Sequence, residues 1–195
     1  MSKASRTKVQ LFEVAIDMFS RLGYDAVTVK DIAEEVGVTE RTFFRHFPHK
    51  STILFPASAE VLSAARQQVL DIDAGSPAEA AVAMTIVMAR QLEQFTDWHP
   101  ERYRILHSSR ELLAVEALQH ELWATEICNA LVERFGIAEL DGRLLGALAT
   151  LVLRESNDDG FRSGRQRATL VEAVRASWQR LVSLGVLSEH LLSSE

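Results

Sequence analysis

The feature that most constrains this chain is one glycine, Gly37, which separates two short stretches near the N-terminus. In the first stretch, Val29–Val36, apolar residues recur at helical spacing, and Thr28 before it is a good helix N-cap. In the second, Glu40–His46, Thr39 can play the same capping part. Because a glycine just after a helix readily adopts the left-handed conformation that ends it, the sequence predicts two short helices joined by a tight turn.

A longer helix is expected before this pair. From Ser5 to Leu22 the apolar residues follow the spacing of one buried helical face, and Gly23 ends the pattern. Three helices with a glycine turn between the last two predict a helix-turn-helix, whose final helix can enter the DNA major groove. Its outward side carries Arg41 and Arg45, and arginine is the commonest reader of guanine. The alternative is an ordinary solvated basic face.

The motif sequence gives a more specific indication. Residues 11–50, LFEVAIDMFSRLGYDAVTVKDIAEEVGVTERTFFRHFPHK, resemble the N-terminal domain of the TetR family of transcriptional regulators. Within that family, RTFFRHFPHK resembles the actinobacterial regulators associated with mycofactocin systems. The resemblance implies a cytoplasmic homodimer that binds a near-palindromic double-stranded operator, and a repressor that a small-molecule effector releases.

The resemblance also implies roles for individual residues. The side chains that would hold phosphate are Thr28, Thr39, Thr42 and Lys50. Arg41 and Arg45 would read bases, and His46 matches the family's usual histidine. Phe44 stands where the family commonly has a tyrosine that donates a hydrogen bond to phosphate, so that bond is missing here. The predicted DNA-binding residues are Thr28, Thr39, Arg41, Thr42, Phe44, Arg45, His46 and Lys50.

The rest of the chain also shows helical spacing and no convincing strand pair, so the fold class expected is all-α with about nine helices. A helix-turn-helix DNA-binding domain would occupy residues 1–50, and an effector-binding and dimerisation domain residues 51–195. The helices expected there are Lys50–Ile72 with a bend at Pro56, Pro77–Thr96, Glu101–His107, Arg110–Phe135, Asp141–Asn157 and Arg167–Leu184, the last two separated by a polar turn at 158–160.

Two surfaces are expected in the body. The family resemblance implies dimerisation through the last two helices, and the predicted interface residues are Leu144, Leu148, Leu151, Leu170, Val174 and Leu181. Methionines and aromatic residues could line an effector pocket with basic groups anchoring an anionic end, as in an acyl-coenzyme A. The candidates are Met84, Met88, Phe95, Trp98, Arg102, Arg104, His107, Trp123, Arg154 and Trp178. The alternative is that these side chains are plain core and surface.

Composition and missing motifs exclude several classes of function. The first fifty residues hold eight Lys and Arg against seven Asp and Glu, a net charge of +1, so the body carries −7 and the whole chain −6. The single cysteine, Cys128, excludes an intramolecular disulfide framework and a cysteine-rich zinc site. We see no phosphate-binding glycine loop, metal-binding histidine motif or membrane-length apolar run, so no enzyme, cofactor, metal or membrane role is expected. A helical enzyme or a protein-interaction module on this motif remains the alternative.

Overall fold

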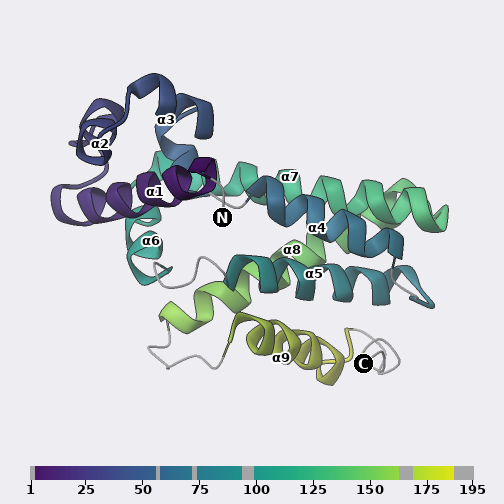
Figure 1. The fold of residues 1–195 in the computed structure, drawn as a ribbon. Coiled ribbons are helices and arrows are strands. Elements are labelled where there is room, and N and C mark those ends of the chain that lie inside the picture. Colours follow the sequence, from purple (N-terminus) through teal and green to yellow (C-terminus); the bar gives the residue numbers. More distant parts are fainter. Residues whose placement is uncertain (1–2, 56–57, 72–73, 94–98, 163–168, 187–195) are drawn as a thin grey trace. The chain divides into compact units, whose positions relative to one another are not determined.

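The computed structural model describes residues 3–55, 58–71, 74–93, 99–162 and 169–186, and these form helices without any strand (Figure 1). The predicted all-α class with about nine helices is thus confirmed for the described residues. The helices are α1 (Lys3–Leu22), α2 (Val29–Val36), α3 (Glu40–His46), the short 3-10 helix η1 (Lys50–Leu54), α4 (Ser58–Asp71), α5 (Pro77–Glu93), α6 (His99–Leu106), α7 (Arg110–Phe135), α8 (Glu139–Arg162) and α9 (Leu170–Ser183).

Several helix ends lie one to three residues from those expected, and two of the expected helices differ by more. A single helix from Lys50 to Ile72 was wrong, because η1 ends at Leu54 and α4 begins only at Ser58. Phe55, which precedes a proline, has φ −127° and ψ 55°, outside the helical region. A proline ring disfavours helical backbone in the residue before it, which explains why the helix stops there. The expected bend at Pro56 lies outside the described residues.

The polar turn expected at 158–160 was also wrong, because α8 continues to Arg162. The polar side chains near this point contact α9. Ser156 Oγ lies 2.7 Å from Ser177 Oγ and donates to the Ala173 carbonyl at 3.4 Å. Hydrogen bonds between helices can compensate for weak helix formers, whose penalties are at most about 1 kcal/mol each.

The described chain forms two compact units. The first holds α1, α2, α3, η1 and α6 with the first two turns of α7, residues 110–116. Its core joins α1 and the helix-turn-helix to residues of α6 and α7, and contains Leu11, Phe12, Ala15, Ile16, Phe19, Tyr24, Val27, Ile32, Phe43, Phe47, Ile53, Leu54, Ile105, Leu106 and Leu112. The boundary expected between residues 50 and 51 stays a prediction.

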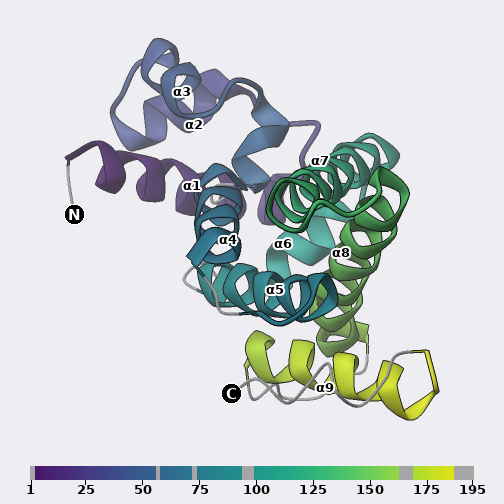
Figure 2. The same ribbon diagram turned by 90° about the vertical axis from the view of Figure 1, so that its right-hand side faces the viewer.

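The second unit holds α4, α5, α8 and α9 with residues 117–135 of α7. Figure 2 shows α7 and α8 side by side, and two glycines explain how closely they pack. A Cβ atom added to Gly146 would lie 2.3 Å from the carbonyl oxygen of Ala124, and one added to Gly142 would lie 2.8 Å from Val132. Gly146 and Gly142 therefore allow a close approach of α8 to α7 of the same chain.

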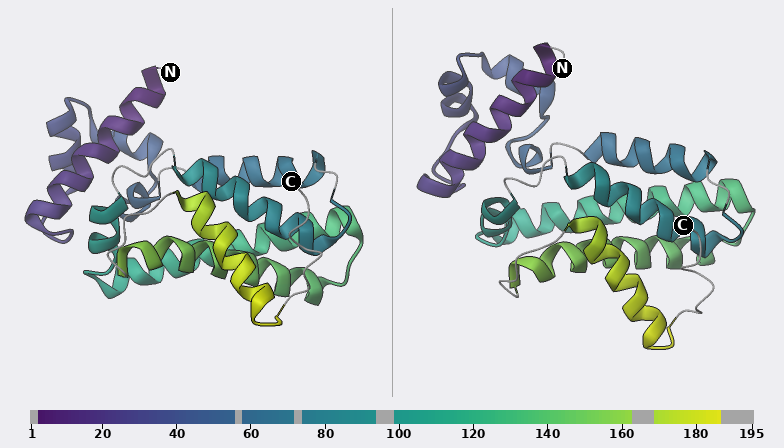
Figure 3. Two further views of the ribbon diagram at one scale, coloured as in Figure 1. Left: turned by 90° about the horizontal axis from the view of Figure 1, so that it is seen from below. Right: turned by 60° about the horizontal axis from the view of Figure 1, so that its bottom comes forward.

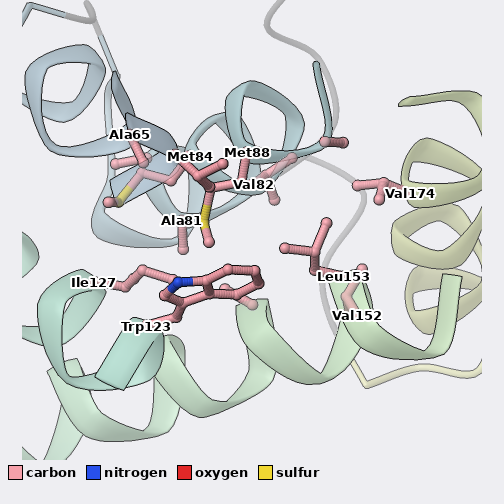
Figure 4. Packing of buried hydrophobic residues seen from close by; sticks show 14 of the residues in the cluster. Ala65, Ala81, Val82, Met84, Met88, Trp123, Ile127, Val152, Leu153 and Val174 are labelled. Atoms are coloured by element: carbon pink, nitrogen blue, oxygen red, sulfur yellow. The ribbon is translucent and has the colours of Figure 1, made fainter. Parts of the chain in front are cut away.

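Helix α9 lies across α5 and α8 in both views of Figure 3 and packs its apolar residues against them. The core of this unit is apolar. Figure 4 shows Trp123 of α7 beneath Met84 and Met88 of α5, with Leu153 of α8 to its right. Among the described residues, the only polar side chains that are buried are Thr85, Thr150 and Ser156, so no charged group enters this core.

Candidate nucleic-acid interface

Helix α2 is capped as its sequence predicts. The Thr28 hydroxyl accepts a hydrogen bond from the Asp31 backbone N–H at 3.2 Å, and the Asp31 carboxylate accepts one from the Thr28 N–H at 2.8 Å. The hydrogen bonds from Thr28 lower the pKa of the Asp31 carboxyl group. Thr28 is exposed, but its hydroxyl also donates to Asp31 at 2.6 Å. Its predicted phosphate contact would have to share the hydroxyl with the cap.

The turn to α3 has the left-handed glycine that its sequence predicts. Gly37 has φ 75° and ψ 33°, a conformation that other residues adopt only with strain. The Thr39 hydroxyl then accepts from the Thr42 backbone N–H at 3.3 Å and lies 3.2 Å from the Thr42 hydroxyl. Phe43 is fully buried beneath α3. Caps at both helices and an apolar anchor therefore hold α3 in one orientation.

The opposite side of α3 presents three side chains to solvent. Arg41, Phe44 and Arg45 are all exposed, and they lie on one face because residues three and four apart are neighbours on a helix. Neither arginine forms an ion pair or hydrogen bond with the described part of the chain. Two unengaged guanidinium groups on a rigidly held helix are suited to phosphate or guanine edges. We call Arg41, Phe44 and Arg45 the recognition face.

The position of Lys50 argues against its predicted phosphate contact. Its ammonium group donates to the carbonyl oxygens of Tyr24 and Val27 at 2.8 and 2.9 Å, and lies 3.9 Å from the centre of the Tyr24 ring. Burial lowers the pKa of this ammonium group. Lys50 therefore ties the start of η1 to the loop between α1 and α2. The sequence does not reveal this, because the loop carbonyls come from residues more than twenty positions away.

His46 also faces inward in part. Its Nε2 is buried and has no hydrogen-bond partner among the described residues. Burial, with the nearby charges of Arg45 and Lys8, lowers the pKa of the ring. Because the Nε2 atom does not face solvent, only the other atoms of the His46 ring could contact DNA. The predicted DNA contact of His46 stays a prediction.

The basic residues expected to anchor an effector in the first unit make other contacts. Arg102 donates to the Leu54 carbonyl at 2.6 Å, pairs with Glu116 at 3.8 Å, and lies over the Phe55 ring at 4.9 Å. These contacts bind α6 to the end of η1. Arg104 is exposed and pairs with Glu101. His107, directly after α6, is exposed and stacks on the Tyr103 ring with centroids 3.9 Å apart.

The pocket candidates of the second unit are either buried in its core or exposed at its surface. Met84, Met88, Trp123 and Trp178 are all buried in one core, where Trp123 and Trp178 have indole N–H groups without a partner among the described residues. Arg154 is exposed and pairs with Glu155 at 3.0 Å, so it does not enter this core. Phe95 and Trp98 lie outside the described residues.

The predicted dimer residues fall into two groups. Leu144 and Leu151 of α8 are 61% and 45% exposed, whereas Leu170 and Val174 of α9 are 2% and 0% exposed. The two α9 residues cannot face a partner, because α9 uses its apolar side within the chain. Leu148 and Leu181 are half-buried. The sequence interpretation did not include three further exposed leucines of α7 and α8 in the second unit, although their spacing opposite the buried side could have revealed them: Leu118, Leu122 and Leu140.

Comparison with known proteins agrees with this geometry. Residues 11–55 match the family model described as bacterial regulatory proteins, tetR family. The chain is 48% identical over 58 residues to the HTH-type transcriptional regulator TcmR of Streptomyces glaucescens, which covers 29% of this chain and 26% of TcmR. It is 25% identical over 135 residues to the putative mycofactocin biosynthesis transcriptional regulator MftR of Mycobacterium tuberculosis, covering 69% of this chain and 68% of MftR.

A solved structure has the same fold along most of the chain. The SmeT–triclosan complex superposes with a TM-score of 0.62 at 13% sequence identity, covering 97% of this chain and 98% of SmeT. The helix-turn-helix and the helical body of the described chain therefore share the fold of this solved structure. The N-terminal residues are thus similar to those of TetR-family regulators, and the family is matched over residues 11–55.

Two further observations concern what the described chain lacks. None of its described helices is both long and apolar enough to cross a membrane. The described residues also contain no group of three or more His, Cys, Asp or Glu placed to hold a metal ion.

Proposed function

We propose that the chain is a sequence-specific transcriptional repressor that binds a near-palindromic operator in double-stranded DNA as a homodimer. The observation that carries this proposal is the recognition face, where Arg41 and Arg45 are exposed and unengaged on a helix anchored by Phe43. Arginine side chains on such a helix can make two hydrogen bonds to one guanine. Repression is the commonest behaviour of the family.

The experiment is a DNA-binding titration with the sequence upstream of the chain's own gene, at several salt concentrations. Arg41→Ala should weaken operator binding by about 1–3 kcal/mol and relax the preference at one base pair of each half-site. The matched control is Arg175→Ala, which removes an exposed arginine of α9 and should leave binding unchanged. Unchanged operator preference in Arg41→Ala would contradict the assignment of Arg41 as a base reader.

The homodimer is supported by the exposed leucines. Leu140, Leu144 and Leu151 lie on the side of α8 opposite its buried residues, and Leu118 and Leu122 lie likewise on α7. Scattered apolar side chains are normal on a surface, but five exposed leucines on two adjacent helices offer a candidate apolar region for a partner. A second copy related by a two-fold axis would cover this region with the same residues. The interface proposed is therefore centred on α8, without Leu170 and Val174.

Release by a small molecule is the second part of the proposal, and the core of the second unit supports an uncharged effector. Met84 and Met88 are adaptable side chains, and Trp123 offers an indole N–H that is buried without a partner. An unpaired buried donor costs about 1–3 kcal/mol, which a ligand carbonyl or ether could recover. A coenzyme A moiety would need cations beside this core, and Arg104 and Arg154 are exposed instead. The effector proposed is an apolar molecule with a hydrogen-bond acceptor.

A further inference from the structure

The recognition face contains one side chain whose chemistry is unlike that of its neighbours. Phe44 is 48% exposed, and it is the only large aromatic side chain so exposed among those whose burial the structure describes. Phe43 and Phe47, its neighbours in sequence, are 0% and 2% exposed and make up the core beneath α3. Phe44 thus presents a bare phenyl ring beside the two exposed arginines of the recognition face.

The ring is held in place by the core. Phe44 packs edge-on against Phe43, with ring centroids 5.5 Å apart and an angle of 79° between the ring planes. Because Phe43 is fully buried and α3 is capped at Thr39, the Phe44 ring has a firm support on its inner side. A supported ring can make a contact that depends on the position of a single methyl group.

A phenyl ring has neither a donor nor an acceptor, so it cannot form the hydrogen bonds by which proteins hold phosphate or the polar edges of bases. The apolar group that the major groove offers is the C5-methyl of thymine. We propose that Phe44 is a specificity-determining residue that contacts the C5-methyl group of one thymine in each half-site. The inference rests on the proposed function, and it assigns the apolar part of the base readout that two arginines cannot supply.

The test removes the methyl group and nothing else. The full-length protein first selects its operator from random double-stranded DNA. Each thymine of the selected operator is then replaced in turn by deoxyuridine, and the dissociation constant is measured by fluorescence anisotropy at constant salt. Burying one methyl group contributes roughly a fourfold change in affinity, so deoxyuridine at the contacted position should weaken binding about fourfold in one half-site and about sixteenfold in both.

Two variants connect the effect to Phe44. In Phe44→Ala, which should fold normally because the side chain is exposed, deoxyuridine at that position should change affinity less than twofold. Arg41→Ala should keep the full deoxyuridine effect, which makes it the matched control on the same helix face. A wild-type protein insensitive to every deoxyuridine, or a Phe44→Ala variant as sensitive as the wild type, would overturn the inference while leaving DNA binding intact. If the protein selects no sequence at all, the proposed function itself fails and the inference with it.

Discussion

Replacing Lys50 by methionine tests whether this lysine stabilises the fold or contacts phosphate. Methionine keeps most of the length and apolar volume of the lysine stem but removes the ammonium group, which leaves the carbonyls of Tyr24 and Val27 without that donor. A hydrogen bond from a charged donor contributes about 1.5–3 kcal/mol, and a cation–π contact about 0.5–2 kcal/mol. The desolvation that lowers the pKa of the Lys50 ammonium offsets part of this gain. We expect the free energy of unfolding to fall by about 2–4 kcal/mol.

The assay has two readouts. Urea denaturation at neutral pH measures the loss of stability, and DNA titrations at several salt concentrations measure the number of phosphates contacted. A lysine that binds phosphate lowers the slope of log affinity against log salt by about one when it is removed. Because the Lys50 ammonium group is engaged within the chain, the slope should not change, although overall affinity should fall.

The control is Lys30→Met, which removes an exposed lysine of α2 that pairs with Glu34 at 3.8 Å. An exposed pair of this kind contributes about 0.3–0.5 kcal/mol, so stability should hardly change. A Lys50→Met protein of normal stability whose salt slope is reduced by one would refute the structural role and restore the phosphate contact expected from the family resemblance.

The remaining predictions concern the body. Leu144→Asp should yield a folded monomer with weak DNA affinity, because it places a charge in the proposed interface, whereas Val174→Asp should unfold the chain, because Val174 is fully buried within it. Light scattering and circular dichroism measure both outcomes, and a Leu144→Asp dimer would contradict the interface. Uncharged apolar ligands such as long-chain methyl ketones should raise the melting temperature and release DNA, and Trp123→Phe should reduce both effects. A rise produced by acyl-coenzyme A and by none of the uncharged ligands would contradict the neutral effector.

Local signals in the sequence were sufficient to predict the helices and the turn of the helix-turn-helix. The bounds of α2 and α3 are those expected, because Thr28, Gly37 and Thr39 act through hydrogen bonds and backbone angles within a few residues. Helix α7 also has the expected bounds, since Gly136 with φ 63° ends it. The exposed positions of Arg41 and Arg45 followed from helical spacing alone.

What could not be predicted depends on contacts between distant residues. The end of α8 depends on Ser156 meeting α9, and the role of Lys50 depends on a loop more than twenty residues away. An apolar stripe such as that of Leu170 and Val174 shows that one side of a helix is buried. It does not show whether the covering surface belongs to the same chain or to a second copy.

The packing of residues 99–116 limits how the N-terminal helix-turn-helix segment can be exchanged between related chains by recombination. Ile105, Leu106 and Leu112 are almost completely buried in the same core as α1 and α3, although they lie far beyond the end of the helix-turn-helix at His46 in the sequence. A fragment ending at residue 55 would therefore expose an apolar surface to water, and a head transplanted from a relative would meet side chains shaped for a different neighbour. New operator preferences should arise more readily through point changes on the outer side of α3 than through recombination of whole heads.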